Sequence, residues 1–390
     1  MSNALVAGVD MVKFAKPGQQ KPYREMASTA IKGAVVEAGI DPSAIEQAYG
    51  SYIYGDSTCA QHALYDAFMT GIPVINVNNN CSSGSSAIFM ARQAVQSGAV
   101  DCALAFGFEE MQPGALGSHW DDRESPFENF LDVLDRAEYP KGPLALRCFG
   151  AAGHHYMETY GAAPDLFAKV AVKTRNHAAL NPNALFTAEL TVEDVMAAPV
   201  LYMDYLTRLM CCPPTCGAGA AIICSEAFAK RHGIEHGVEI VAQAMATDTP
   251  ATWDNPINLV GADMTRRAAH EVYELAGIGA EEVDVVELHD CFTTNEVITY
   301  EGLGLCAEGE ATAFVDNGDN TYGGKFVVNP SGGLMSKGHP IGATGLAKCY
   351  ELVNQLRNTA GQRQVAGARV ALQHNLGLGG AAVVTMYRRA

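Results

Sequence analysis

The sequence predicts an α/β fold that is built from two similar halves. Short apolar runs alternate with longer segments in which apolar residues recur at helical spacing, and this alternation is typical of βαβ units. An Ala-Gly-Ile tripeptide precedes a predicted strand twice, at residues 38–40 and at residues 276–278. A turn rich in small residues opens a long helix twice as well, at residues 81–87 and at residues 339–345. Because the matches occur in the same order, they indicate a duplicated unit.

The N-terminal half is predicted to alternate strands with helices. Residues 23–39 have helical periodicity and end at Gly39, a residue type that commonly stops a helix. Residues 56–69 are expected to form a loop and a short helix, and the long helix follows Cys81. Strands are expected where the sequence is apolar or β-branched, at residues 4–9, 45–54, 74–77 and 100–106.

The middle of the chain differs from both halves. Residues 119–148 are charged and weakly periodic, so we expect a loop region that caps a site, and residues 149–209 are expected to be mostly helical. A strand returns at residues 217–224, and the second half adds strands at residues 285–288 and 370–374. The expected units are residues 1–235 for the N-terminal half, about 115–205 for the insertion within it, and 236–390 for the C-terminal half.

Composition and charge exclude several functional classes. The formal net charge of −17 argues against nucleic acid as a partner, although a local basic patch would suffice for an anionic cofactor. No apolar run approaches the roughly 20 residues of a membrane span. The 11 cysteines include Cys211, Cys212 and Cys216, but no second pair at zinc spacing accompanies these three, so we expect reduced thiols and no metal.

Cys81 is the first candidate for a catalytic residue. It follows the strand at residues 74–77 and three asparagines that favour a tight turn, and it lies at or just before the first residue of a helix. Helix N-terminal amides would stabilise a thiolate there, and Gly84 would let a substrate or another helix approach closely. This is the environment of an activated nucleophile, and the alternative is a buried structural cysteine.

Three C-terminal segments place polar groups at the ends of apolar strands, which is where open α/β sheets bind ligands. His289 and Cys291 would point the same way if their strand continued, and Pro340 would be the first residue of a helix that His339 caps. The turn after residue 374 would offer backbone amides to an anionic oxygen. A structural role stays open for each segment: a hydrogen-bonded histidine with an inert thiol, a capping histidine, or a plain glycine turn.

Four ordered motifs carry a resemblance that covers essentially the whole chain. They are Asn-Asn-Asn-Cys-Ser-Ser-Gly-Ser at residues 78–85, His-Asp-Cys-Phe at 289–292, Ser-Lys-Gly-His-Pro-Ile-Gly-Ala-Thr-Gly at 336–345 and Gln-His-Asn-Leu-Gly-Leu-Gly-Gly at 373–380. Together they resemble the thiolase superfamily, and within it the sterol carrier protein x type. The resemblance implies the thiolase fold, in which two pseudo-twofold-related βαβαβαββ halves form a five-layer α-β-α-β-α sandwich. Cys81 and His339 would then face each other across the pseudo-twofold axis.

The chain departs from most other thiolases at two of these motifs. Those enzymes have Asn-Glu-Ala-Phe where this chain has residues 289–292, and they have Cys-x-Gly where it has residues 374–376. The second thiol has therefore moved from one motif to another, and it is Cys291 here.

The resemblance implies an acyltransferase that cleaves a 3-ketoacyl-CoA with CoA, or runs the reverse Claisen condensation, through an acyl-Cys81 intermediate. Branched or sterol side-chain substrates are compatible with it. Three alternatives remain: a thiolase-like retro-aldol lyase on steroid side-chain CoA esters, a ketoacyl-synthase-type condensing enzyme, and a non-catalytic lipid-binding scaffold. The presence of Cys81 together with His289, Cys291 and His339 favours the thiolase.

The resemblance also assigns roles to individual residues. His339 would take the proton of Cys81, and Cys291 would serve first as an acid and then as a base. His339 and His289 would polarise the thioester oxygen of CoA. The remaining expected site residues are Cys81, Leu376 and Gly377, whose backbone amides would hold the oxygen on the attacked carbon, and His374 and Asn375 as possible supporting side chains.

Coenzyme A enters these expectations as a substrate, with no permanently bound cofactor. The resemblance implies a homodimer or a dimer of dimers and, in some relatives, a small OB-fold partner protein. Residues 111–160 would line the acyl tunnel, and the C-terminal residues are no peroxisomal Ser-Lys-Leu-type signal, so we expect a cytoplasmic enzyme of fatty acid β-oxidation. Candidates for CoA binding, by charge alone, are Arg147, Lys169, Lys173, Arg175 and Lys337.

Overall fold

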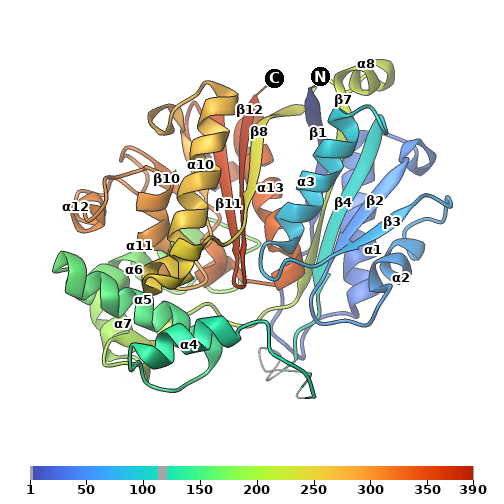
Figure 1. The fold of residues 1–390 in the computed structure, drawn as a ribbon. Coiled ribbons are helices and arrows are strands. Elements are labelled where there is room, and N and C mark those ends of the chain that lie inside the picture. Colours follow the sequence, from blue (N-terminus) through green and yellow to red (C-terminus); the bar gives the residue numbers. More distant parts are fainter. Residues whose placement is uncertain (1–2, 113–119, 121, 390) are drawn as a thin grey trace.

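The computed structural model describes residues 3–112, 120 and 122–389, which form a large mixed sheet with helices on its faces (Figure 1). The strands are β1 (Ala4–Met11), β2 (Gln47–Ser51), β3 (Val74–Val77), β4 (Cys102–Glu109), β5 (Val200–Tyr202), β6 (Leu206–Thr207), β7 (Gly217–Ser225), β8 (Val238–Ala246), β9 (Val285–Glu287), β10 (Val327–Val328), β11 (Val370–Gly377) and β12 (Ala381–Arg389). The helices are α1 (Tyr23–Ala38), α2 (Cys59–Tyr65), α3 (Ser83–Gln96), α4 (Glu128–Arg136), α5 (Leu144–Tyr160), α6 (Asp165–Ala178), α7 (Val192–Ala197), α8 (Glu226–His232), α9 (Pro256–Leu259), α10 (Ala262–Ala276), α11 (Thr293–Gly302), α12 (Ala311–Asp316) and α13 (Thr344–Arg357).

The strand order of the large sheet is symmetric about its centre. From edge to edge the strands run β10-β9-β11-β12-β8-β1-β7-β4-β2-β3, so every strand of the N-terminal half has a counterpart in the C-terminal half. Within the halves, β2 pairs in parallel with β3 and β4, as β9 pairs in parallel with β10 and β11. The halves join where β1 and β8 pair antiparallel at Leu5–Glu239 and Val6–Val238. This order confirms the duplicated unit that the sequence predicts.

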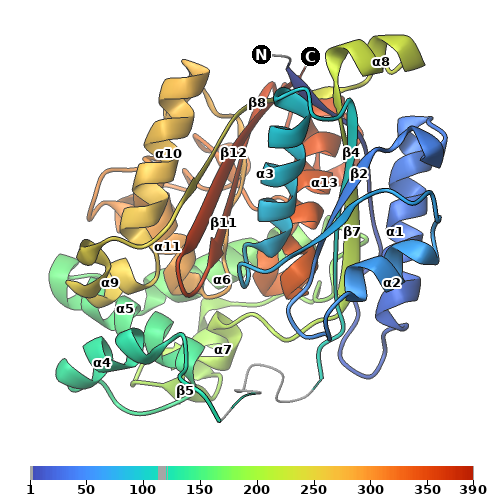
Figure 2. The same cartoon turned by 45° about the vertical axis from the view of Figure 1, so that its right-hand side comes forward.

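The helices complete a five-layer arrangement. α3 and α13 lie between the two half-sheets and pack against each other (Figures 1 and 2). α1 and α2 cover the outer face of the N-terminal half-sheet, and α10 covers the outer face of the other, with α11 beside it. The expected α-β-α-β-α sandwich is therefore confirmed, and its central layer brings the first turns of α3 and α13 together.

The two central helices touch through their backbones. A Cβ atom on Gly345 would lie 2.2 Å from the backbone nitrogen of Ser85, and one on Gly84 would lie 2.9 Å from the nitrogen of Gly345. Side chains larger than hydrogen would force the helices apart, so glycine is needed at both positions. This crossing determines how close the turns that precede the two helices can come.

Three local predictions are wrong. β2 ends at Ser51, short of residue 54, because the amides of Ile53 and Tyr54 donate to the Glu109 carboxylate and leave the sheet. β9 ends at Glu287, so the strand does not continue through the two residues expected to point together, His289 and Cys291. Pro340 is extended, and a 3₁₀ turn at Ile341–Ala343 separates it from α13, so His339 does not cap that helix.

The segment between β4 and β7 is mainly helical. It holds α4 to α7 and the small β5–β6 sheet, so the loop region expected at residues 119–148 is replaced in part by α4 and the start of α5. Phe130, Val133 and Leu134 have helical spacing and are buried, which explains why this charged stretch folds as α4. Residues 119 and 121 of the expected cap lie outside the described residues, as do residues 113–118 before it, and the expected unit boundaries stay predictions. No helix in the described part of the chain has both the length and the hydrophobicity to cross a bilayer.

Gly345→Ala tests the helix crossing. Because the added methyl group would meet the backbone of α3, we expect the free energy of unfolding to fall by about 3 kcal/mol, measured by urea denaturation. Ser97→Ala, at the exposed end of α3, is the control and should change the free energy by less than about 0.5 kcal/mol. Equal stability of the two variants would contradict the proposed backbone contact.

Candidate active site

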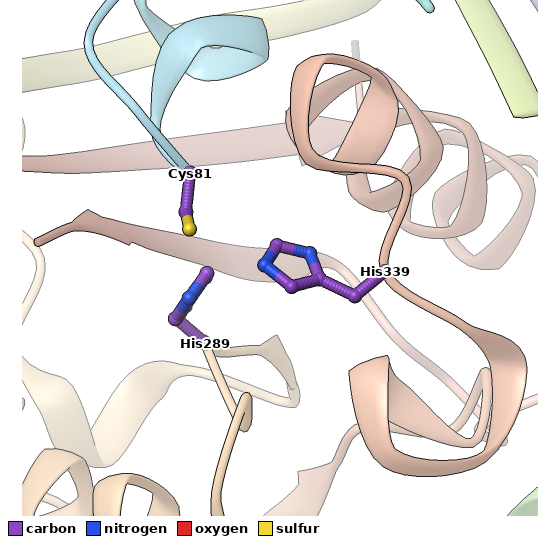
Figure 3. A group of neighbouring side chains, drawn as sticks. All are labelled: Cys81, His289 and His339. Carbon is purple, nitrogen blue, oxygen red and sulfur yellow. The ribbon is translucent and has the colours of Figure 1, made fainter. Parts of the chain in front are cut away.

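Three predicted site residues converge between the half-sheets. The Cys81 sulfur and one ring nitrogen each of His289 and His339 all lie within 4.8 Å of one another. The two imidazole rings are nearly perpendicular, at 82°, with centroids 5.1 Å apart. Figure 3 shows that the side chains reach this point from the turn before α3, from the loop after β9 and from the segment before α13. One small molecule can therefore contact all three.

The hydrogen bonds of His339 define its protonation. Its Nδ1 lies 2.7 Å from the Thr344 hydroxyl, and that hydroxyl donates its single proton to the Pro340 carbonyl at 2.9 Å. Thr344 can therefore only accept from His339, which places the imidazole proton on Nδ1. The buried Nε2 has no hydrogen-bond partner among the described residues. It carries a lone pair that is free to accept a proton.

Burial keeps both reacting groups neutral. Burial and, secondarily, the Glu109 carboxylate raise the pKa of Cys81 to about 12, and burial with the Lys348 ammonium lowers the pKa of His339 to about 3. Burial thus opposes the Cys81 thiolate that helix amides were expected to stabilise, and the state of the resting thiol stays a prediction. Cys81 precedes Ser82, the N-cap of α3, and the desolvation of its sulfur outweighs the helix dipole.

Cys291 lies beside this group. Burial and the neighbouring thiols of Cys212 and Cys81 raise the pKa of Cys291 above its usual range. The Cys212 amide donates to the Cys291 carbonyl at 2.9 Å. The backbone of Cys211 forms an isolated antiparallel β-bridge with Phe292. Cys212 is a further neighbour of the site that was not predicted from the sequence, although the adjacent cysteine pair at 211 and 212 was a signal for it.

Two of the three cysteines first considered as metal ligands make hydrogen bonds to different backbone carbonyls. The Cys211 thiol donates to the Thr207 carbonyl at 3.4 Å, and the Cys216 thiol donates to the Met111 carbonyl at 3.4 Å. Among the described residues, the side chains that lie close enough together to hold a metal ion are instead those of Cys81, His289 and His339.

The end of β11 packs on the turn that carries Cys81. A Cβ atom on Gly377 would lie 2.2 Å from the Asn79 carbonyl oxygen and 2.7 Å from the Ser82 hydroxyl. Leu376 and Gly377 still belong to β11 and are not part of the glycine turn that we expected. The backbone close to Cys81 is therefore a strand end, and the role predicted for its amides stays a prediction.

His374 has no free ring nitrogen. Its Nδ1 accepts from the His289 amide at 3.4 Å, and its Nε2 lies 3.0 Å from the Thr265 hydroxyl. The side chain is fully buried. This geometry favours a structural role for His374 and leaves proton transfer to the other two histidines.

Two buried charged residues escaped the sequence analysis. Glu109 accepts from the amides of Ile53, Tyr54 and Gly342, at 3.2, 3.0 and 2.9 Å, and burial raises its pKa to about 7. Lys348 is fully buried on α13, donates to the His374 carbonyl at 2.8 Å, and has its pKa lowered by that burial. A lone lysine or glutamate in a sequence gives no signal of burial, so neither residue could be singled out.

Most of the basic residues considered for CoA binding are occupied elsewhere. Arg147 is buried and pairs with Asp135, and Lys173 is buried and pairs with Glu296. Lys337 is also buried. These three are inaccessible to a phosphate on the surface. Lys169 pairs with Asp165 and Asp316, and Arg175 donates to Ser336.

Known sequences match both halves of the chain. Residues 6–198 match the family described as "Thiolase, N-terminal domain", and residues 246–387 match "Thiolase C-terminal domain-like". The chain is 53% identical over 395 residues to "Sterol carrier protein 2" of Rattus norvegicus, which covers 100% of this chain and 72% of that relative. It is 33% identical over 400 residues to "Acetyl-CoA acetyltransferase" of Methanothermobacter thermautotrophicus, with 100% of both chains covered.

Solved structures match along the whole chain as well. The "Ltp2-ChsH2(DUF35) aldolase" superposes with a TM-score of 0.84 at 21% identity, covering 99% of this chain and 98% of that one. Human mitochondrial 3-ketoacyl-CoA thiolase in complex with CoA superposes with a TM-score of 0.74 at 16% identity, covering 100% and 98%. At such low identity these matches bear on the fold alone, and they confirm the thiolase fold.

The alkylation rate of Cys81 tests the protonation of the resting site. Only the thiolate reacts with iodoacetamide, so for a thiol of raised pKa we expect the rate to increase about tenfold per pH unit between about pH 7 and pH 9. Mass spectrometry of the Cys81 peptide measures the rate, and Cys81→Ala identifies the background. A rate that is already constant at neutral pH would mean that a thiolate–imidazolium pair exists at rest.

Proposed function

Because this chain belongs to the thiolase family, with sterol carrier protein 2 among its relatives, we propose that it is a 3-ketoacyl-CoA thiolase. The observation that carries the proposal is the convergence of the Cys81 sulfur with two neutral imidazoles, one of which has a free lone pair. A thiol beside a proton acceptor is what covalent catalysis requires of a nucleophile. Coenzyme A would be a substrate.

The first half-reaction forms the acyl enzyme. Substrate fills the site, Nε2 of His339 takes the thiol proton, and the Cys81 sulfur attacks the 3-keto carbon. The backbone amides of Cys81 and of Leu376 or Gly377 would hold the resulting oxyanion. When the Cα–Cβ bond breaks, its electron pair forms the enolate of acetyl-CoA, or of propionyl-CoA for a 2-methyl substrate. Cys291 then gives the enolate carbon a proton and is left as a thiolate.

The second half-reaction regenerates the resting state. The Cys291 thiolate takes the proton of a new CoA thiol, and the CoA sulfur attacks the thioester carbon of acyl-Cys81. The Cys81 sulfur leaves and recovers its proton from the His339 imidazolium. Each group therefore ends as it began, and one CoA is consumed for each shortened acyl-CoA released.

A second candidate is a retro-aldol lyase on side-chain CoA esters. Its support is the likeness to an aldolase of the same fold, at 21% identity. A lyase has no need of an acyl-cysteine, whereas the thiolase reaction uses Cys81 and both neighbouring imidazoles. Release of an aldehyde or ketone without consumption of free CoA would favour the lyase, and lipid binding without turnover would favour a non-catalytic scaffold.

Further features accompany the proposed activity as predictions. They are a homodimer or dimer of dimers, a cytoplasmic location, a part in fatty acid β-oxidation and a small OB-fold partner. The DUF35 component named with the aldolase is consistent with such a partner. The substrate range requires an assay across 3-ketoacyl-CoA thioesters, from acetoacetyl-CoA to steroid side chains, that follows the CoA-dependent loss of enolate absorbance.

Cys81→Ala tests the nucleophile. Because no acyl enzyme can form, we expect CoA-dependent cleavage of the best substrate to fall by at least about 10⁴-fold, with circular dichroism unchanged. Cys306→Ala is the matched control, since Cys306 is another partly exposed cysteine and has no role in the mechanism. Full activity of the Cys81 variant would remove this residue from the mechanism and the thiolase proposal with it.

Cys291→Ala tests whether the second thiol acts as the acid while Cys81 remains the nucleophile. Without the acid that protonates the enolate, we expect turnover to fall by about 10²- to 10⁴-fold, while iodoacetamide still labels Cys81. Rapid-quench mass spectrometry should show slower acylation of Cys81 by the 3-ketoacyl-CoA. A variant with unchanged turnover would assign the proton transfers to another group.

A further inference from the structure

Asn375 joins two of the proposed catalytic residues. Its Nδ2 donates to the Cys81 carbonyl oxygen at 2.9 Å and lies 2.9 Å from Nδ1 of His289. The side chain is fully buried on β11, so these contacts replace water. It therefore reaches the backbone of the nucleophile and the ring of one histidine at the same time.

The orientation of the Asn375 amide follows from its partners. A backbone carbonyl can only accept, so the atom that faces the Cys81 oxygen must be the NH₂ group. On the other side, the Ser85 hydroxyl donates to Oδ1 of Asn375 at 2.9 Å. The Ser85 hydroxyl, which can donate as well as accept, is compatible with this orientation, and a flipped amide would lose the hydrogen bond to the Cys81 carbonyl.

A chain of donors holds Ser85 in this role. Gln373 donates through Nε2 to the Ser85 hydroxyl at 2.8 Å and to the Gly345 carbonyl at 2.9 Å. The Tyr387 hydroxyl donates to Oε1 of Gln373 at 2.9 Å. Because the Gly345 carbonyl can only accept, the Gln373 amide is oriented as well. The hydrogen bonds therefore run in one direction from Tyr387 to Asn375.

We propose that Asn375 is a positioning residue that holds His289 with its proton on Nε2. One N–H of the Asn375 amide is used by the Cys81 carbonyl, and the other donates to Nδ1 of His289, which therefore carries a lone pair. The two imidazoles then present unlike atoms to the site. His339 offers a lone pair for a proton, and His289 offers an N–H for a developing oxyanion. The catalytic meaning of this division rests on the proposed thiolase function.

The same proton works against metal binding. One sulfur and two imidazole nitrogens within 4.8 Å form a donor set of the kind that zinc uses. With its proton on Nε2, His289 has no lone pair to give a metal in the site. Moving that proton to Nδ1 would turn two N–H donors toward each other, at the 2.9 Å contact with Asn375. The site is thereby arranged for an oxyanion.

The test is a two-bond ¹H–¹⁵N NMR spectrum of protein labelled at the histidine ring nitrogens, with His289→Gln to assign the signals. We expect the wild type to show a protonated Nε2 and an unprotonated Nδ1 for His289. In Asn375→Asp, a carboxylate replaces the donor, so Nδ1 should become protonated. A wild-type His289 with its proton on Nδ1 would overturn the proposal, and that result is obtained even if the variant fails to fold.

Kinetics give a second measurement. Asn375→Ala should lower kcat by about 10²-fold with a smaller effect on KM, because the oxyanion donor is no longer held in place. Ser85→Ala should lower kcat by less than about tenfold, since the Cys81 carbonyl still orients the amide. Asn317→Ala, at an exposed position, is the control and should leave kcat unchanged. Unchanged kcat in Asn375→Ala would also overturn the proposal.

These results separate the proposal from the function on which it rests. If the wild type cleaves no 3-ketoacyl-CoA, the thiolase function fails, and the NMR spectrum still decides the protonation of His289. If the wild type is active and the spectrum places the proton on Nδ1, the function stands and the role of Asn375 is refuted.

Discussion

The backbone contact between α3 and α13 is the constraint on which the site depends. Gly84 and Gly345 let the two central helices touch, and this brings the turns before them within reach of one another. The ends of β11 and β4 add further contacts, each with the turn that belongs to the other half. A Cβ on Gly377 of β11 would meet the Asn79 carbonyl at 2.2 Å, and one on Gly107 of β4 would meet the Gly342 carbonyl at 2.1 Å. Each half thus supports the functional turn of the other.

Burial determines the chemistry that this geometry permits. A separated thiolate and imidazolium would be costly in a site where burial disfavours both charged forms. A reactive sulfur is therefore expected to form only as the proton moves during attack, when the negative charge passes on to a carbonyl oxygen. Lys348 is fully buried and donates to the His374 carbonyl, and burial lowers its pKa to about 7; in its protonated form it contributes a positive potential to a region where negative charge develops.

Much of the fold and part of the site could be predicted from the sequence. Periodicity and repeated short segments were sufficient for the α/β class and the duplication, because both are local patterns. Residue chemistry marked Cys81, His289 and His339, which the fold brings together. The protonation of Cys81 could not be predicted, because it depends on burial by segments far away in the sequence. The end of β9 was missed for a related reason, since strand pairing determines where a strand stops.

Duplication gives the two halves equivalent turns before α3 and α13, and those turns carry unlike groups, Cys81 in one half and His339 in the other. At the end of β4, Glu109 accepts from the Gly342 amide, and at the end of β11, Asn375 donates to the Cys81 carbonyl. Each contact joins the end of a strand in one half to the functional turn of the other half, and the two are opposite in the direction of donation. A perfectly symmetric pair of halves would present two like groups to the substrate, whereas acyl transfer needs a proton acceptor and a hydrogen-bond donor at different atoms. Divergence of the polar side chains at the strand ends provides that difference without altering the helix crossing.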